Sequence, residues 1–354
     1  MNWLNQCHFG DCLETLKRLP DGIAQTCVTS PPYFGLRDYS GGAAEIGKEK
    51  TPAEFVAALV AVFREVRRVL NDDGSLWVNM GDSYGKGKQL LGIPWRLAFA
   101  LQDDGWILRQ EIIWAKPNPM PESVTDRCTK SHESIFLLAK SEKYYFDAGA
   151  IKEPAAPGSI ARWNQDIEGQ IGSNRIPGKT NGAMKAVGGR LAGNVNPPKG
   201  QAAYEAGDES HRTKGGLLAY AQRQAAGKGG KNAFRGQGHQ REGGNGPANR
   251  EGRDMQDVGT GETRNKRSVW TVATTPYKGA HFATFPVALI EPCILAGAPS
   301  GGVVLDPFFG SGTTGQVAQN LGRKFIGCEL NPAYKALQDE RLQQPSFIFD
   351  LEAA

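Results

Sequence analysis

The 354-residue sequence lacks several features that would assign it to a specialised class. It has no run of about 18 apolar residues, which is the length that a membrane-spanning helix requires. Its first residues, MNWLNQCHFGDC, contain neither the basic segment nor the apolar segment of a secretory signal peptide. No internal repeat is visible. We therefore expect a cytoplasmic protein that makes no contact with a membrane.

Cysteine is scarce, and none of the 6 cysteines forms a C-x-x-C pair. This spacing argues against a zinc ribbon, and the scattered positions argue against a framework of disulfide bonds. We interpret the cysteines as reduced and mostly structural, and we predict no metal site.

Two regions of the chain have the alternating pattern of an α/β protein. Residues 1–150 and 268–354 alternate short apolar runs with helical patterns, which is typical of βαβ units around a mostly parallel sheet. The stretch TPAEFVAALVAVFREVRRVL predicts a helix, because Thr51 suits the N-cap, Pro52 suits the first turn and Glu54 completes a capping box. With 40% hydrophobic residues, the chain can bury a sizeable core.

Residues 151–267 have a different composition. They contain 23 of the 45 glycines, and their 19 Lys and Arg exceed their 11 Asp and Glu. Apolar periodicity is almost absent, so burial cannot readily offset the entropy lost on ordering. We expect an irregular, partly mobile insert whose charge favours a polyanionic partner. The alternative is an insert that is merely solvated.

A glycine-rich turn lies between a predicted strand and a predicted helix in VVLDPFFGSGTTG. Gly310, Gly312 and Gly315 match the pattern G-x-G-x-x-G, and Glu329 ends the next predicted strand. Taken alone, this pattern is the fingerprint of a dinucleotide site. A P-loop is excluded, because Gln316 stands where its lysine would be.

Asp306 argues against a dinucleotide at this glycine turn, which we define as residues 306–315. A pyrophosphate would be repelled by a carboxylate at the end of the strand, whereas an ammonium group would be attracted. S-Adenosylmethionine carries an ammonium, a sulfonium and a ribose without phosphate, and Glu329 could accept hydrogen bonds from both ribose hydroxyls. The alternative is that Asp306 caps a turn and Glu329 is a solvated strand end.

The stretches DPFFGSGTT and GRKFIGCELNPAY, together with TSPPY at residues 29–33, resemble the permuted, β-class S-adenosylmethionine-dependent DNA amino-methyltransferases. In that family the catalytic half comes first, a target-recognition region follows, and the cofactor half comes last. The resemblance covers about residues 8–145 and 265–343, and the glycine-rich middle matches no recognition region that we can assign.

The resemblance implies a circularly permuted, Rossmann-like α/β fold, with a mostly parallel twisted sheet and helices on both faces. Residues 1–150 would form the catalytic half, 151–267 the irregular recognition region, and 268–354 the cofactor half. The two halves would complete one sheet, with ligands outside the carboxyl ends of its strands. The hydroxyl turn, residues 29–33, must then meet the glycine turn in space.

The family also implies roles for the hydroxyl turn. Ser30 Oγ and the Pro31 carbonyl would accept hydrogen bonds from the exocyclic amino group of a flipped base, which frees the lone pair of its nitrogen. Pro32 stiffens the loop, and Tyr33 offers an aromatic face to the base, with Phe34 as the alternative. The methyl group would then pass in line from the sulfonium to the nitrogen.

No cysteine nucleophile is needed for this reaction. We therefore interpret Cys293, within the helical pattern PVALIEPCILAG, as a core residue. His132 precedes a predicted strand in TKSHESIF, and we interpret it as structural.

Two further groups of residues are candidates for binding. Asp11 ends HFGD, a predicted strand that would continue the sheet and bring this residue near the adenine of the cofactor. The implied cofactor-binding residues are Asp11, Asp306, Phe308, Gly310, Gly312, Thr313 and Glu329. The insert would contact DNA phosphates, and its candidates are Arg162, Arg175, Lys179, Arg235, Arg241, Arg264 and Arg267.

Several alternatives stay open at this point. A serine before Pro-Pro-Tyr favours N4 of cytosine as the target, with N6 of adenine as the alternative. The methyl acceptor could instead be RNA or a protein glutamine, or the chain could be a non-catalytic nucleic-acid-binding protein or a nicotinamide oxidoreductase. The expected partner is double-stranded DNA in a prokaryotic or phage-encoded system, and the resemblance allows a homodimer and a cognate restriction endonuclease.

Overall fold

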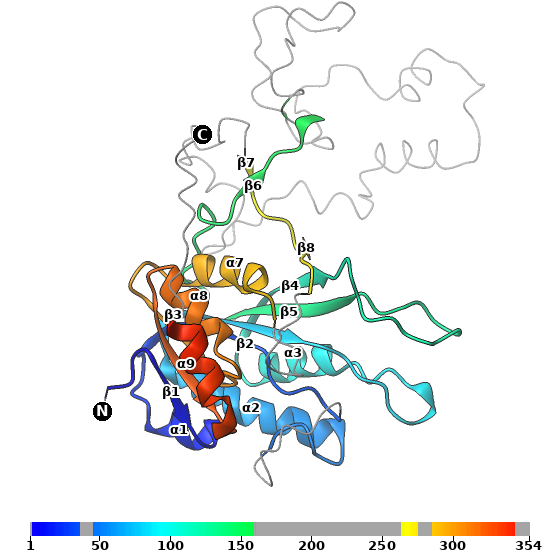
Figure 1. The fold of residues 1–354 in the computed structure, drawn as a ribbon, viewed down its shortest axis with the longest axis horizontal. Coiled ribbons are helices and arrows are strands. Elements are labelled where there is room, and N and C mark those ends of the chain that lie inside the picture. Colours follow the sequence, from blue (N-terminus) through cyan, green and yellow to red (C-terminus); the bar gives the residue numbers. More distant parts are fainter. Residues whose placement is uncertain (1, 36–44, 159, 161–262, 275–284, 344–354) are drawn as a thin grey trace, which may run out of the picture. The chain divides into compact units, whose positions relative to one another are not determined.

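The computed structural model describes residues 2–35, 45–158, 160, 263–274 and 285–343 (Figure 1). The chain divides into two units, one comprising Met1–Ala156 with Thr260–Ala354 and the other Pro157–Gly259. The helices and strands described below belong to the first unit. Within the described residues, no helix combines the length and the apolar character that crossing a membrane requires.

A sheet of eight strands forms the centre of this unit, in the order β1-β10-β9-β2-β3-β5-β4-β8. Its strands are β1 (Gln6–Phe9), β2 (Ala24–Thr29), β3 (Leu70–Met80), β4 (Ile107–Ala115), β5 (His132–Ala139), β8 (Val269–Thr271), β9 (Val303–Asp306) and β10 (Lys324–Glu329). Neighbouring strands are parallel, except that β5 is antiparallel to both β3 and β4. A separate antiparallel pair, β6 (Glu153–Pro154) with β7 (Thr263–Arg264), joins the two ends of the insert.

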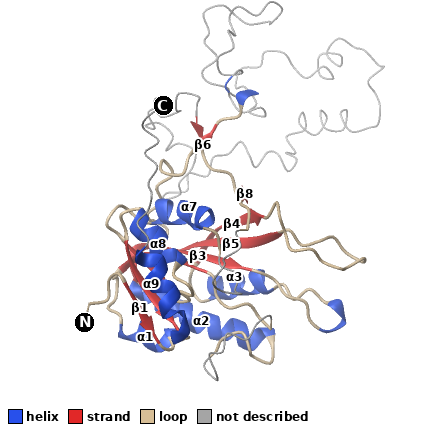
Figure 2. Cartoon of the chain, viewed as in Figure 1, coloured by secondary structure: helices blue, strands red, loops and turns tan. Residues whose placement is uncertain are grey.

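Helices cover both faces of the sheet (Figure 2). The helices α1, α2 and α3 pack together on one face, whereas α7 and α8 pack on the other with α9 against α8. Their bounds are α1 (Cys12–Arg18), α2 (Pro52–Val69), α3 (Ile93–Asp103), α7 (Val287–Gly297), α8 (Thr313–Asn320) and α9 (Lys335–Gln343), with short 3-10 turns η2 (Lys86–Lys88) and η7 (Pro332–Tyr334). The capping box predicted at the start of α2 is confirmed, because the side chains and amides of Thr51 and Glu54 bond reciprocally.

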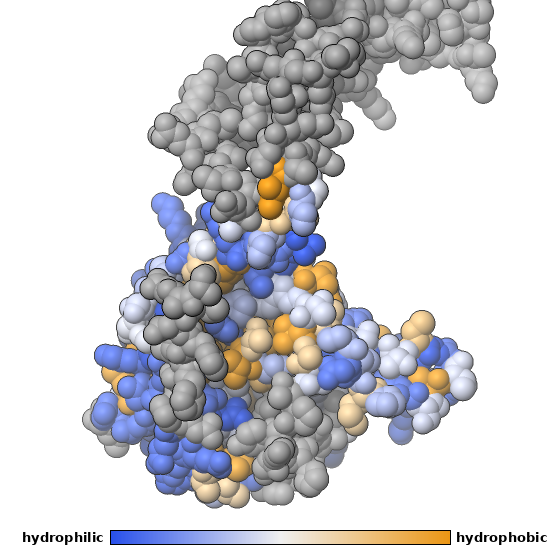
Figure 3. Space-filling view, turned by 45° about the horizontal axis from the view of Figure 1, so that its top comes forward, coloured by the Kyte–Doolittle hydropathy of each residue, from blue (hydrophilic) through white to orange (hydrophobic). Residues whose placement is uncertain are grey.

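The alternation of side chains along each strand divides the core into two layers. On β3, Leu76 and Val78 belong to the cluster beneath α1, α2 and α3, whereas Trp77 belongs to the cluster beneath α7 and α8. On β2, Cys27 and Val28 divide in the same way. These two strands are therefore buried on both faces of the sheet. The molecular surface seen in Figure 3 is mainly hydrophilic, with smaller hydrophobic areas.

After the neighbouring parallel strands β9 and β2, the chain continues toward opposite edges of the sheet. From β2 it passes through α2 to β3 on one side, and from β9 it passes through α8 to β10 on the other. In open α/β sheets, ligands bind outside the carboxyl ends of the strands at such a switch point. The hydroxyl turn follows β2 and the glycine turn begins where β9 ends, so both lie at this position.

Candidate active site

The glycine turn is organised by Asp306, whose side chain is almost fully buried at 1% exposure. Its Oδ1 accepts hydrogen bonds from Thr29 Oγ1 at 2.6 Å and from the Phe308 amide at 3.0 Å, and its Oδ2 accepts from Thr314 Oγ1 at 2.6 Å. Burial raises the pKa of this carboxyl to about 6, although the hydrogen bonds from the two threonines oppose the rise. Asp306 therefore ties the glycine turn to β2 and to the start of α8.

Glu329 at the end of β10 holds the glycine turn from the neighbouring strand. The Gly310 amide donates to one carboxylate oxygen at 2.8 Å, and the Asn331 amide donates to the other at 2.8 Å. The side chain is 9% exposed, and burial raises its pKa. Each oxygen keeps a second lone pair, so the carboxylate could still accept from a ligand.

Two glycines of the motif have backbone conformations that favour glycine. The φ angles of Gly310 and Gly312 are +53° and +86°, in the left-handed region. Gly315 serves a different purpose, because a β-carbon there would lie 2.5 Å from the buried ring of Phe309. The same ring lies against Gly327 of β10. Gly315 therefore makes room for a core phenylalanine.

The other predicted cofactor-binding residues have structural partners of their own. Asp11 follows β1, which pairs with the strand of Glu329, and its side chain caps α1. The ring of Phe308 forms a T-shaped pair with Phe63 of α2, and the hydroxyl of Thr313 accepts a hydrogen bond from Arg341 of α9. Their roles in binding a cofactor stay predictions.

Ser311 is a residue that the sequence analysis passed over. It lies within the glycine turn and is 5% exposed, and its hydroxyl has no hydrogen-bond partner among the described residues. A buried hydroxyl without a partner is costly, so a polar ligand group at this turn would relieve that cost. The only sequence signal was its position between two glycines.

The hydroxyl turn lies beside the glycine turn, as the sequence analysis required. Ser30 directly follows Thr29, whose side chain bonds to Asp306 across 277 residues of sequence. Pro31 is buried and Pro32 is half-buried, so the loop is held on the edge of the sheet. The structure therefore brings these two turns, from opposite ends of the chain, to one place.

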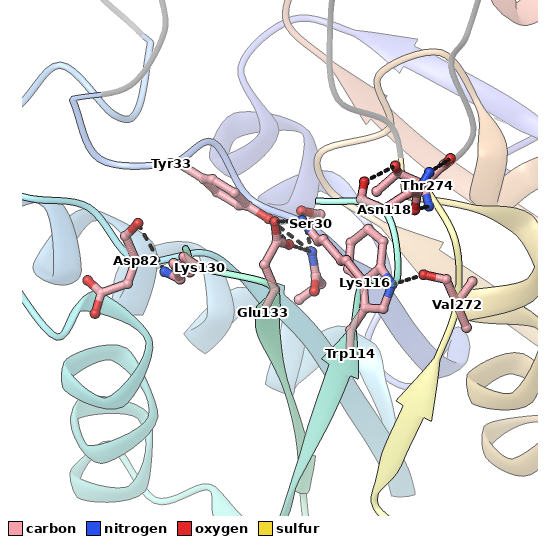
Figure 4. Close-up of polar contacts among 11 residues, drawn as sticks. Ser30, Tyr33, Asp82, Trp114, Lys116, Asn118, Lys130, Glu133, Val272 and Thr274 are labelled. Carbon is pink, nitrogen blue, oxygen red and sulfur yellow. Dashed lines mark hydrogen bonds and ion pairs between the residues drawn. The ribbon is translucent and has the colours of Figure 1, made fainter. Parts of the chain in front are cut away.

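Four side chains from separate segments converge next to Ser30 (Figure 4). Tyr33 Oη donates to Glu133 Oε2 at 2.6 Å, and Asn79 Nδ2 donates to the same oxygen at 2.9 Å. Asn79 Nδ2 also lies 3.4 Å from Ser30 Oγ and 3.0 Å from Tyr33 Oη. Lys116 Nζ forms an ion pair with the other oxygen of Glu133. We call Tyr33, Asn79, Lys116 and Glu133 the tyrosine–glutamate network.

The antiparallel strands of the sheet position this network. Asn79 lies near the end of β3, Glu133 lies near the start of β5, and Lys116 follows the end of β4. None of these three residues was predicted from the sequence, where only the neighbouring His132, which is exposed, was interpreted. The available signal was the presence of polar residues beside apolar runs of the sequence, in NMGD and HES.

The residues predicted to contact DNA have different positions. The ring of Phe34 packs against Phe55 of α2 with 5.5 Å between centroids, so it faces the core rather than the network. The Nε atoms of Arg264 and Arg267 lie 2.9 Å and 2.7 Å from the same carboxylate oxygen of Glu153. The remaining candidates, Arg162, Arg175, Lys179, Arg235 and Arg241, lie outside the described residues.

Cys293 is a core residue, as interpreted from the sequence. It lies in α7 with 1% exposure, its Sγ is 3.6 Å from the Leu289 carbonyl oxygen, and burial raises the pKa of its thiol. A thiol in this state does not ionise readily, so it cannot act as the nucleophile of a methyl transfer.

Comparison with known proteins gives a consistent result. A family model for N6 and N4 methyltransferases, described as DNA methylase, matches residues 24–340. The type II methyltransferase M.XycI of Xanthomonas campestris pv. cyanopsidis is 38% identical over 374 residues, covering 98% of this chain and 90% of its own length. M.Cfr9I of Citrobacter freundii, also a type II methyltransferase, is 38% identical over 362 residues, with 94% and 86% coverage.

A solved structure shows the same fold. The PvuII DNA methyltransferase, described as cytosine-N4-specific, superimposes with a TM-score of 0.56. The match covers 96% of this chain and 87% of that chain at 18% sequence identity. At this level of identity the similarity concerns the arrangement of strands and helices.

Proposed function

Because this chain belongs to the N6/N4 DNA methylase family of S-adenosylmethionine-dependent amino-methyltransferases, we propose that it methylates N4 of cytosine in double-stranded DNA. The type II methyltransferases that it resembles suggest a restriction–modification system with a cognate endonuclease. The observation that carries the proposal is the bond between Thr29 and Asp306 at 2.6 Å. Through it, the hydroxyl turn and the glycine turn share one site.

The side chains of the glycine turn, together with Glu329 of β10, fit S-adenosylmethionine. Asp306 supplies negative charge for the ammonium group, and Glu329 retains lone pairs for the ribose hydroxyls. The buried hydroxyl of Ser311, which has no partner among the described residues, would gain one from the amino-acid part of the cofactor. When bound, the cofactor supplies an electrophilic methyl group on its sulfonium.

The hydroxyl turn would hold the base. Ser30 Oγ and the Pro31 carbonyl accept the two N–H groups of the exocyclic amine, which draws the nitrogen toward tetrahedral geometry. Tyr33 supplies the aromatic face for a base flipped out of the duplex. A serine rather than an aspartate at this position favours cytosine over adenine.

In this proposal the fold is a circular permutation. Residues 1–150 form the catalytic half, 151–267 the recognition region, and 268–354 the cofactor half. The parallel pairing of β1 with β10 supports this arrangement, because it joins strands from opposite ends of the chain into one sheet.

The decisive experiment measures transfer of tritiated methyl groups from S-adenosylmethionine to DNA, RNA and protein, followed by modification-sensitive sequencing of the methylated DNA. We expect incorporation into DNA alone, as N4-methylcytosine at one short sequence. N6-methyladenine would establish the alternative target. Cofactor binding without any incorporation would favour a non-catalytic binding protein, and binding of NAD in place of S-adenosylmethionine would favour an oxidoreductase.

The basic insert leads to a separate expectation for DNA affinity. Contacts to phosphates release counterions, so the logarithm of the binding constant should fall linearly with the logarithm of the salt concentration. Fluorescence anisotropy with a labelled duplex measures this slope. Binding that does not change with salt would contradict phosphate recognition by the insert.

A further inference from the structure

We propose that Glu133 is a positioning residue, which holds Asn79 and Tyr33 in the orientations that methyl transfer at Ser30 requires. The inference rests on the proposed function and extends it to residues that do not touch the substrate. Glu133 is well placed for this role, because its two oxygens bond to three members of the site from three different segments.

Glu133 determines which way the amide of Asn79 faces. An amide group can in principle be turned over, which exchanges its nitrogen and its oxygen. With Glu133 Oε2 only 2.9 Å from Asn79 Nδ2, the turned amide would place its oxygen against a carboxylate. In the observed orientation, Asn79 Oδ1 is buried and has no partner among the described residues. The observed orientation directs the N–H groups of Asn79 toward Glu133 and Ser30, and its cost is an acceptor oxygen that has no partner among the described residues.

This orientation prepares Ser30 for its substrate. A hydroxyl oxygen has two lone pairs and one proton. When Asn79 Nδ2 donates to one lone pair of Ser30 Oγ, the other lone pair is available for the amino group of the base. The present separation of 3.4 Å is long, as catalytic hydrogen bonds often are before the substrate is bound.

Glu133 also restrains the ring of Tyr33. On one side the ring lies against Gly81, where a β-carbon would be 2.5 Å from Tyr33 Cε2. At its end, the hydroxyl is held by the 2.6 Å bond to Glu133. An aromatic face that stacks on a base must be held in one plane, and these two restraints provide that.

Lys116 keeps the carboxylate of Glu133 paired. The two side chains are 18% and 13% exposed, and a charge at that depth needs a partner. The ammonium of Lys116 also lies 4.2 Å from the ring centroid of Trp114, whose Nε1 donates to the Val272 carbonyl at 2.8 Å. The tyrosine–glutamate network is therefore anchored to β4 and to the segment that follows β8.

The first test replaces Glu133 by glutamine, which keeps the size of the side chain and removes its charge. Because a 1 Å misplacement at a reacting centre can cost about 100-fold in rate, we expect single-turnover methylation of DNA to slow by about 10- to 100-fold. The dissociation constant for S-adenosylmethionine should stay within about twofold, since no cofactor group is held by the network.

Glu111→Gln is the matched control. Glu111 lies on the adjacent strand β4 and accepts a hydrogen bond from Ser134 Oγ at 2.8 Å, so its replacement removes the charge of a hydrogen-bonded carboxylate outside the network. We expect this variant to methylate DNA at the wild-type rate. Equal rates for Glu133→Gln and wild type, or equal losses in both glutamine variants, would overturn the proposal.

Tyr33→Phe provides a second measurement, which also applies if Glu133→Gln proves unstable, and the two variants together allow a double-mutant cycle. Tyr33→Phe keeps the aromatic face and removes only the hydroxyl that Glu133 holds, so we expect a rate several-fold below wild type. The combined variant should lose less than the product of the two single losses, because both act on one restraint. A wild-type rate in Tyr33→Phe, or strictly multiplicative losses, would overturn the inference. If the wild-type protein itself fails to methylate DNA, the proposed function fails instead.

Discussion

The glycine turn and the tyrosine–glutamate network lie at the same edge of the sheet, yet they are held in different ways. The glycine turn is a contiguous segment, and the carboxylates of Asp306 within it and of Glu329 on the neighbouring strand accept from backbone amides and from two threonine hydroxyls. The tyrosine–glutamate network joins four distant segments, and its bonds run between side chains, with one ion pair.

The difference suggests a division of tasks between the two regions. Backbone amides that are fixed by a turn suit a ligand with constant shape, such as a cofactor. A network of side chains can place polar atoms where they orient a reacting group. That orientation is lost when one member of the network is removed. We therefore expect changes at the glycine turn to alter cofactor affinity and stability, and changes near Ser30 to alter the rate.

The largest effect is expected for Ser30→Ala. Removal of one preorganised hydrogen-bonding group from a catalytic site commonly costs about 100- to 1,000-fold in rate, and we expect a loss of this size in single-turnover methylation. Cofactor affinity, measured by titration calorimetry, should not change. Ser141→Ala is the control, because the hydroxyl of Ser141 donates to the carbonyls of Asp72 in β3 and of Lys143, outside the proposed site. A collapse of cofactor binding in Ser30→Ala would contradict the division of tasks.

Glu329→Ala should have the next largest effect, on cofactor affinity. It removes an acceptor for the ribose together with the carboxylate to which the Gly310 and Asn331 amides donate, so we expect binding to weaken by about 10- to 100-fold. Titration calorimetry again provides the measurement, with the exposed Glu340→Ala of α9 as the control. An unchanged dissociation constant would remove the role that we assign to Glu329.

The pKa of Asp306 predicts a smaller effect that depends on pH. With a pKa of about 6 in the folded protein, this carboxyl is mostly protonated at pH 5 and cannot attract an ammonium group. Cofactor binding should therefore tighten by about tenfold between pH 5 and pH 7 and then level off. The Asp306→Asn variant should lose this slope, and a dissociation constant in the wild type that is independent of pH would contradict direct recognition of the ammonium by Asp306.

The raised pKa of Asp306 has the opposite consequence for folding: the stability of the protein without cofactor should fall as the pH rises. Because burial raises the pKa from 3.8 to about 6, folding favours the protonated carboxyl. Its contribution to stability is complete below pH 4 and is lost as the pH rises through 6. Unfolding by urea at several pH values, compared between wild type and Asp306→Asn, measures this contribution.

The smallest effect on methylation is expected for Gly315→Ala. The added β-carbon would press on Phe309, and overpacking of this kind costs about 1–3 kcal/mol of stability. With saturating cofactor the methylation rate should stay near that of the wild type. Gly158→Ala is the control, because a β-carbon there meets nothing within 4 Å. Equal stability of the two variants, measured by urea unfolding, would show that Phe309 moves aside without cost.

Local patterns in the sequence were sufficient for much of the fold. The capping box at Thr51, the apolar runs of the central strands and the turn from Asp306 to Gly315 all depend on residues close together in the chain. Such signals are readable because helical and strand periodicities and glycine turns are local properties. The role of Gly315 was not readable in this way, because the packing of Phe309 against it involves a ring that the glycine motif does not single out.

The sequence by itself therefore determined the α/β texture, the hydroxyl turn and the glycine turn. Only the tertiary structure decided that Thr29 bonds to Asp306, and that Tyr33, Asn79, Lys116 and Glu133 form one network beside Ser30. The physical reason is that strand order and register place these side chains together, and these are set by the packing of the whole sheet. Tyr33 and Glu133 are 100 residues apart in the chain, and no local pattern records that their oxygens lie 2.6 Å from each other.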